Sequence, residues 1–217
     1  MAFSSQGVGA PNFAMLDQVR SYWHSLRVGS ALPMRDAVEP RGMAEALEST
    51  FLIERIAPGM ARFRIAGLHV QDLIGLDVRG MPLATLFEPP ARPRLAKELD
   101  TVFSAPAALE MWLEGERGIG RPTLDGRMLL LPLSDGQGSV SMALGCLAMA
   151  GGMGRAPRRF AITGLLREVF ARHTAAPSGK TPDDFAPMPT LRKMAQIHPQ
   201  PDADRPKAHL RLVYSRD

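Results

Sequence analysis

Cysteine is almost absent from this chain of 217 residues, which carries Cys146 alone. A single cysteine excludes a disulfide within the chain and a metal site built from several cysteines. Cys146 lies in an apolar run, where a buried small side chain is more typical than a reactive thiol. The five histidines also lack the spacing of metal ligands on one helix. The sequence therefore predicts neither a disulfide framework nor a metal centre.

Long apolar runs are missing as well. The longest uncharged stretch, residues 139–154, is too short and too rich in glycine to span a bilayer. The first thirteen residues lack the basic start and the continuous apolar core of a signal peptide. We therefore expect a cytoplasmic protein.

Catalytic motifs are also absent. The sequence contains no nucleophile elbow and no clustering of serine, histidine and aspartate. Residues 178–181, Ser-Gly-Lys-Thr, resemble the end of a phosphate-binding loop, but Pro182 breaks the helix that such a loop needs. We expect no enzyme and no catalytic residues.

Charge is unevenly distributed. Residues 1–150 contain 14 Lys+Arg and 16 Asp+Glu, whereas residues 151–217 contain 12 and 6, a net charge of +6. A basic segment can bind nucleic acid, an anionic membrane or an acidic protein, and the alternative is a solvated charged extension. Seven prolines between Ala171 and Pro206 favour disorder there. We expect a flexible N-terminus over 1–12, one domain over 13–152 and a basic, proline-rich tail over 153–217, partly disordered.

An amphipathic helix is predicted near the N-terminus, over about Phe13 to Arg27. One apolar stripe runs along it at spacings of three and four residues, formed by Leu16, Val19, Trp23 and Leu26. The stripe could pack on the helix's own domain or form a homodimer interface. The sequence leaves both open. An extended connector, Leu32 to Pro40, and a short helix around residues 41–48 are expected to follow.

The stretch from Ala61 to Phe87 is the organising feature of the chain. A short strand runs into Gly67, a helical segment over 68–74 stops at Gly75, and Pro82 opens another short helix after Gly80. Short helices separated by glycines are typical of a chain that wraps a pocket. A longer helix is predicted from about Pro93 to Phe103.

Five strands are predicted, at about residues 50–56, 61–66, 109–116, 123–133 and 140–150. The last two are apolar on both faces, as central strands are, whereas the second and third carry charge on one face, as edge strands do. We therefore expect an antiparallel sheet in the order 2-1-5-4-3, with helices on one face and the N-terminal helix on the other. Pro132 should mark a strand end or a bulge. Residues 158–170 fit a further strand or a short helix equally, and residues 210–214 could form another strand.

Several short motifs recur together in this order. They are Tyr22-Trp23, the Leu-Pro-Met-Arg connector with Pro40, residues 63–67 (Phe-Arg-Ile-Ala-Gly), Gly75 and Gly80 before residues 83–87, residues 130–133 (Leu-Leu-Pro-Leu) and Leu144-Gly145. The set resembles a short bacterial branch of PAS domains, over roughly residues 16–150. The resemblance implies an α+β fold with an antiparallel sheet cupping short helices, and a role in signal transduction. The branch often has threonine after the second-strand glycine, where this chain has Leu68-His69.

A ligand pocket is expected inside that cup. Its candidate residues are Phe63, Ile65, His69, Leu73, Phe87, Leu109, Met111 and Leu113. Haem is disfavoured because His69 stands at a helix start, and flavin photochemistry is disfavoured because the only cysteine lies outside the pocket helices. We expect a sensory module that binds a small ligand, a signalling protein partner or both. The alternative is a regulator that binds nucleic acid or a membrane through its basic tail.

Overall fold

A six-stranded antiparallel sheet forms the centre of the protein. The computed structural model describes residues 13–135, 137 and 139–170. The strand order is β2-β1-β5-β4-β3-β6, which contains the predicted order 2-1-5-4-3 and confirms it. The strands are β1 (Thr50–Ala57), β2 (Met60–Ala66), β3 (Ala107–Gly115), β4 (Leu124–Ser134), β5 (Val140–Gly151) and β6 (Phe160–Val169).

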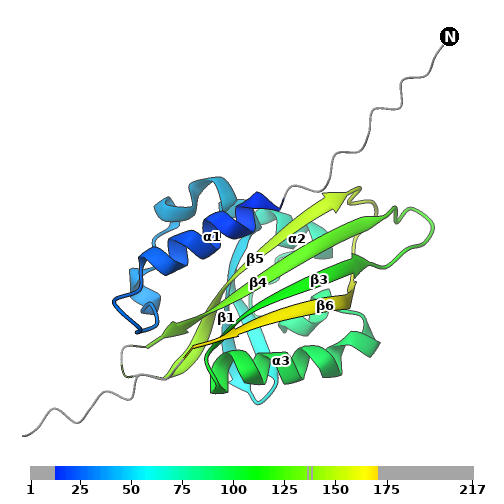
Figure 1. Cartoon of the computed structure of the whole chain (residues 1–217). Helices are drawn as coiled ribbons and strands as arrows, with labels where there is room; N and C mark the ends of the chain where they lie inside the picture. The colour runs from blue at the N-terminus through cyan, green and yellow to red at the C-terminus, as the bar shows by residue number, and fades with distance from the viewer. Residues whose placement is uncertain (1–12, 136, 138, 171–217) are drawn as a thin grey trace, which may run out of the picture. The chain divides into compact units, whose positions relative to one another are not determined.

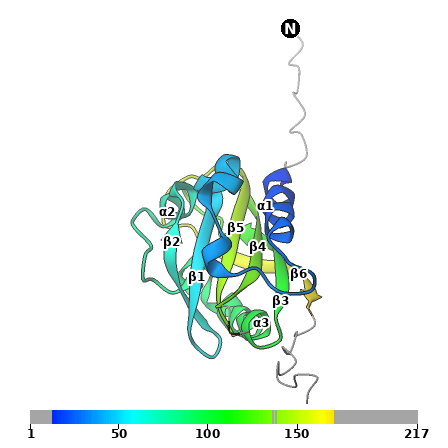
Figure 2. The ribbon, with the colours of Figure 1, turned by 90° about the vertical axis from the view of Figure 1, so that its left-hand side faces the viewer.

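Helices cover both faces of the sheet, and Figure 2 shows α1 and α2 on opposite sides of it. The α-helices are α1 (Ala14–Ser25), α2 (Leu68–Ile74) and α3 (Arg92–Ser104). The 3₁₀ helices are η1 (Arg35–Ala37), η2 (Pro40–Ser49), η3 (Leu83–Leu86) and η4 (Pro89–Ala91). Helix α1 lies across β4 and β5 in Figure 1, and with η2 it covers that face of the apolar central strands.

The alternation of side chains along the central strands separates two cores. On β4, Met128 and Leu130 pack towards α2 and α3, whereas Leu129 and Leu131 pack towards α1 and η2. All four side chains are buried. Because β4 is apolar on both faces, helices pack against the sheet from both sides.

The segment that follows β2 has the predicted succession of short helices. Helix α2 ends at Gly75, whose φ of 82° is left-handed and whose N–H donates to the carbonyl of Gln71 at 2.7 Å. Glycine reaches this conformation without the steric cost that a Cβ would bring. The chain then turns back along β2, where the N–H of Phe63 donates to Met81 and that of Gly80 donates to Phe63. This return covers part of the free edge of β2.

The sheet has six strands and not five, which corrects the prediction. Residues 160–169, for which the sequence left strand or helix open, pair antiparallel with the whole of β3. The predicted boundary between domain and tail, at residue 153, is therefore too early, because β6 follows it and belongs to the sheet. Phe160 and Arg158, both fully buried, belong to the folded domain. The prediction for residues 210–214 lies outside the described residues.

Strand β3 is consequently an inner strand, and its charges have another explanation. Glu110 forms ion pairs with Arg20 of α1 at 2.6 Å and with Arg127 of β4 at 3.5 Å. The Arg127 guanidinium also lies 5.3 Å from the ring centroid of Trp112. The charged face of β3 therefore binds α1 and β4, and it does not protect an edge.

Pro132 lies inside β4, two residues before its end. Pairing with β3 extends along β4 only to Leu130, so at Pro132 the strand has only β5 as a neighbour. A residue without an N–H costs the sheet nothing on a side without a partner strand. The free carbonyl of Pro132 accepts a hydrogen bond from the indole Nε1 of Trp23 at 3.0 Å.

Candidate functional site

The predicted pocket residues form a packed core. Six of the eight belong to the cluster between the sheet and helices α2 and α3, and each is at most 3% exposed: Phe63, Leu73, Phe87, Leu109, Met111 and Leu113. Their side chains contact one another and the helices, so the sheet and short helices enclose side chains there. A ligand among them would have to displace buried apolar side chains.

Ile65 lies on the other side of the sheet and is 55% exposed. The pairing of β1 with β2 shifts between Leu52 and Ile53, which face Ile65 and Phe63 respectively. Leu52 and Ile53 are successive residues and point to opposite faces, so Phe63 and Ile65 do the same. An irregularity at Arg64 therefore turns Ile65 away from the cup.

His69 stands at the start of α2 and is half exposed. Its Nδ1 lies 2.8 Å from the hydroxyl oxygen of Ser49, and its Nε2 lies 3.4 Å from the Glu48 carboxylate. Serine, histidine and glutamate in this order resemble a hydrolase triad, but Ser49 is only 2% exposed and no substrate can reach its hydroxyl. The contacts instead fasten the end of η2 to the start of α2.

The apolar stripe of α1 packs on its own domain. Leu16, Val19 and Trp23 are at most 2% exposed and join the core on the α1 side of the sheet, while Leu26 is half-buried at the end of the helix. Since one chain already buries the stripe, these side chains could contact a second chain only if α1 moved. The homodimer stays a prediction.

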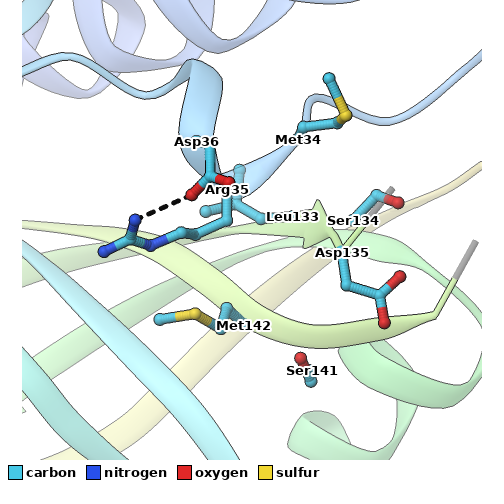
Figure 3. Close-up of a pocket in the computed structure, with 8 residues that line it drawn as sticks. All are labelled: Met34, Arg35, Asp36, Leu133, Ser134, Asp135, Ser141 and Met142. Atoms are coloured by element: carbon cyan, nitrogen blue, oxygen red, sulfur yellow. Dashed lines mark hydrogen bonds and ion pairs between the residues drawn. The ribbon is translucent and has the colours of Figure 1, made fainter. Parts of the chain in front are cut away.

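An open pocket lies at the other end of the sheet, where β4 turns into β5 (Figure 3). It has a volume of about 240 Å³. The lining residues come from the connector after α1 and from the ends of the two strands: Met34, Arg35, Asp36, Leu133, Ser134, Asp135, Ser141 and Met142. Three of the lining residues are apolar and five are polar or charged, so the pocket offers both kinds of contact to an amphipathic molecule.

The connector builds one wall of this pocket by continuing the sheet. Met34 forms a parallel β-bridge with Ser134, and the N–H of Ser134 donates to the carbonyl of Pro33 at 2.9 Å. The same strand, two residues earlier, holds Trp23 through Pro132. The pocket is therefore connected to α1 in two ways. The connector that follows α1 is bridged to β4 at the pocket, and β4 itself accepts the hydrogen bond of Trp23.

Charges at the pocket margin are already partly paired. Arg35 contacts Asp36 at 2.9 Å, as the dashed line in Figure 3 shows. The Asp135 carboxylate accepts backbone N–H bonds from Gln137 at 2.9 Å and Ser139 at 3.1 Å, which shapes the β4–β5 turn. The lining holds one arginine and two aspartates, a net charge of −1. A neutral or weakly cationic polar group would therefore suit the margin better than an anion.

Other chemistries find little support in the described part of the chain. Burial raises the pKa of the Cys146 thiol to about 12, so the thiolate is scarce at neutral pH. Residues 13–170, without 136 and 138, contain no group of three or more His, Cys, Asp or Glu side chains placed to hold a metal ion. Within the same residues, no helix has the length and hydropathy to cross a membrane.

The sequence did not predict this open pocket. Most of the residues predicted to line a pocket belong instead to the packed core. The pocket residues belong to segments about a hundred positions apart, Met34–Asp36 and Leu133–Met142, and neither segment has a periodic pattern. Two local signals were visible: the connector flanked by prolines and the tight Ser-Asp-Gly-Gln-Gly turn. Neither signal indicates that the two segments meet.

Comparison with known proteins agrees with this architecture. No curated protein matches the chain. A PAS domain family matches residues 13–148, which include α1, the connector, strands β1 to β4, most of β5 and all the short helices between them. PAS domains are in general sensory and signalling modules. The antiparallel sheet with short helices on one face is the arrangement expected of them, and the chain belongs to the PAS domain family.

Proposed function

We propose that this PAS domain is a non-catalytic sensor in which a small neutral or weakly cationic amphipathic molecule occupies the open pocket of Figure 3. Occupancy changes how α1 is held on the sheet, and α1 or the surface it leaves then presents a contact to a signalling protein. A ligand changes output only if it binds the two arrangements unequally. The pocket and the seat of α1 must therefore be physically connected.

The observation that carries the proposal is the connection through β4. Leu133 and Ser134 line the pocket, and the carbonyl of Pro132, directly before them, holds the indole of Trp23. A ligand that moves the end of β4 or the connector at Met34 acts on α1 through the Trp23 hydrogen bond and through the chain that follows the helix. The cup on the opposite face is filled by buried apolar side chains, which further supports a site outside it.

The experiment is a ligand search on the purified full chain. Native mass spectrometry identifies a molecule that copurifies, and a fragment library is then screened by thermal shift. Met142→Trp places a large ring in the pocket and is expected to abolish the thermal shift of any true ligand. Met60→Trp is the matched control, because Met60 is 48% exposed at the start of β2 and does not line the pocket.

Two outcomes would contradict the proposal. A ligand that stabilises the Met142→Trp variant as much as the control binds elsewhere. A ligand that binds the pocket but leaves the tryptophan fluorescence and the protease sensitivity of α1 unchanged has no connection to the helix. In the second case the domain binds a small molecule without the transmission proposed.

A second candidate function is regulation through the basic tail, supported by a net charge of +3 over residues 171–217, which contain 8 Lys+Arg and 5 Asp+Glu. Its test is salt-sensitive binding to DNA or anionic vesicles that is lost when the tail is removed. The deletion has to start after Phe170, because residues 160–169 are strand β6. Binding that survives this deletion excludes the tail as the contact.

A further inference from the structure

The turn between β3 and β4 exposes an isoleucine completely. Gly118 and Arg121 exchange two backbone hydrogen bonds, at 3.3 and 3.0 Å, and leave Ile119 and Gly120 at the apex. Gly120 has the left-handed φ of 72° that such a turn requires. Ile119 is 103% exposed, the highest value among the large hydrophobic side chains that are exposed. Figure 1 shows this connection extending past the end of the sheet.

The apex is held rigidly by a second loop, residues 152–159. The N–H of Arg155 donates to the carbonyl of Gly120 at 2.8 Å, and a Cβ on Gly154 would lie 2.5 Å from that same carbonyl oxygen. The backbone next to Ile119 is therefore tied to the second loop, and the Ile119 side chain projects into solvent from it. An apolar side chain fixed in solvent binds a partner with little further loss of conformational entropy.

Arg158 fastens the two loops together from inside. It is fully buried, and its guanidinium donates to the carbonyls of Glu116 at 3.2 Å and Pro122 at 2.8 Å on the turn side. On the other side it donates to Gly152 at 3.2 Å and to Met153. Arg158 is thus a structural residue whose two terminal guanidinium nitrogens are both hydrogen-bonded, and it sets the position of the apex.

Positive charge surrounds the apex. Residues 115–123 and 152–159 together contain five arginines and one glutamate. Arg117 is paired with Glu114 at 2.7 Å and Arg121 with Glu116 at 2.7 Å. Within the described residues no carboxylate forms an ion pair with Arg155, which is exposed. Burial, and after it the charge of Arg121, lowers the pKa of Arg158, which also reflects the crowding of positive charge there.

We propose that this apex, Arg117–Arg121 with Arg155, docks the domain on an anionic lipid bilayer, with Ile119 entering the interface and the arginines contacting lipid phosphates. A bilayer presents negative charge outside and apolar chains beneath, which matches arginines set beside a projecting aliphatic side chain. An acidic protein would need a concave apolar hole to receive the convex apex. Nucleic acid would engage the arginines and gain little from Ile119. This docking goes beyond the proposed sensing function and does not depend on it.

The test is cosedimentation of the full chain with vesicles of phosphatidylcholine alone or mixed with phosphatidylglycerol, at low salt. Ile119→Asp is expected to weaken partitioning to the anionic vesicles about tenfold or more, because it removes the inserted side chain and adds a negative charge. Val28→Asp is the matched control, since Val28 is also an aliphatic residue, 83% exposed, in a turn. Arg155→Gln is expected to weaken binding about fivefold, for one lost charge.

A second readout reports insertion directly. The only native cysteine is buried with a raised pKa, so an Ile119→Cys variant can be labelled selectively with an environment-sensitive dye. The dye at position 119 should shift its emission to the blue with anionic vesicles, whereas a dye at Val28→Cys should not. Thermal melts of each variant verify that the fold is intact.

Each remaining outcome overturns the proposal. If the two aspartate variants bind vesicles alike and deletion after Phe170 abolishes binding, the contact is the tail. If the apex variants lose binding only to polyglutamate or to duplex DNA, the partner is an acidic protein or a nucleic acid. Absence of vesicle binding by the full chain at low salt, with an unshifted dye at 119, rejects membrane docking outright.

Discussion

The hydrogen bond from Trp23 to Pro132 provides the sharpest test of how α1 is held. Trp23→Phe keeps an aromatic ring in the core but removes the indole N–H, and it leaves the carbonyl of Pro132 without its donor at a fully buried position. The ring of Trp23 also lies 5.2 Å from that of Phe170, the residue directly after β6. The substitution therefore affects contacts of α1 with β4 and with the residue that follows β6.

The magnitude follows from the two losses. A buried carbonyl left unsatisfied costs about 1–3 kcal/mol, and the smaller ring loses roughly 1 kcal/mol of packing. The free energy of unfolding should fall by about 2–4 kcal/mol in total, a large share of the stability typical of such a domain. For a domain of this size the melting temperature should drop by roughly 5–12 °C.

The assay is chemical denaturation of the full chain followed by fluorescence, because the sequence has only two tryptophans and each variant retains one. Trp112→Phe is the matched control: Trp112 is half-buried on β3, and no indole hydrogen bond is found for it within the described residues. The control should cost less than half as much. If Trp23→Phe is no more costly than Trp112→Phe, α1 is not seated on the sheet in solution, and the transmission proposed through β4 fails.

Two further predictions concern buried groups. Cys146 should resist alkylation at pH 8 in the native protein and react fully after denaturation, since burial raises its pKa to about 12; mass spectrometry of the alkylated chain measures this, and rapid native labelling would contradict the described packing. Glu98→Gln removes the charge of a carboxylate that is 2% exposed and pairs with Arg167 across α3 and β6. Because Arg167 is 40% exposed and keeps access to water, we expect a loss of only about 1–2 kcal/mol in unfolding free energy, and an unchanged midpoint in urea would show that the pair contributes nothing.

Most of the fold could be predicted because its patterns are local. The stop at Gly75, the stripe of α1 and the two-sided apolarity of β4 and β5 each follow from neighbours in the sequence. Sheet order followed from the charge distribution even though the reason given for β3 was wrong: its glutamates bind α1 and β4. The outcome was correct because β2, the other charged strand, really is an edge.

The parts that escaped prediction depend on single residues or distant pairs. An irregularity at Arg64 reverses the face of Ile65, and nothing in the alternation of residues 61–66 marks it. Residues 160–169 satisfy both a helical and a strand pattern, so the free edge of β3 decides between them. The pocket forms where Met34 meets the end of β4, a contact that only the folded chain creates.

The late position of β6 in the sequence has a consequence for the order in which the domain can be completed. During synthesis, β1 to β5 leave the ribosome before Phe160 does. Until β6 follows, one edge of β3 has no partner strand, and the core site that the buried Phe160 ring fills is empty. A nascent chain in this state offers a ready template for another chain. A fragment that ends at residue 152 should therefore yield a species that aggregates, whereas the next 17 residues, up to Val169, close the sheet.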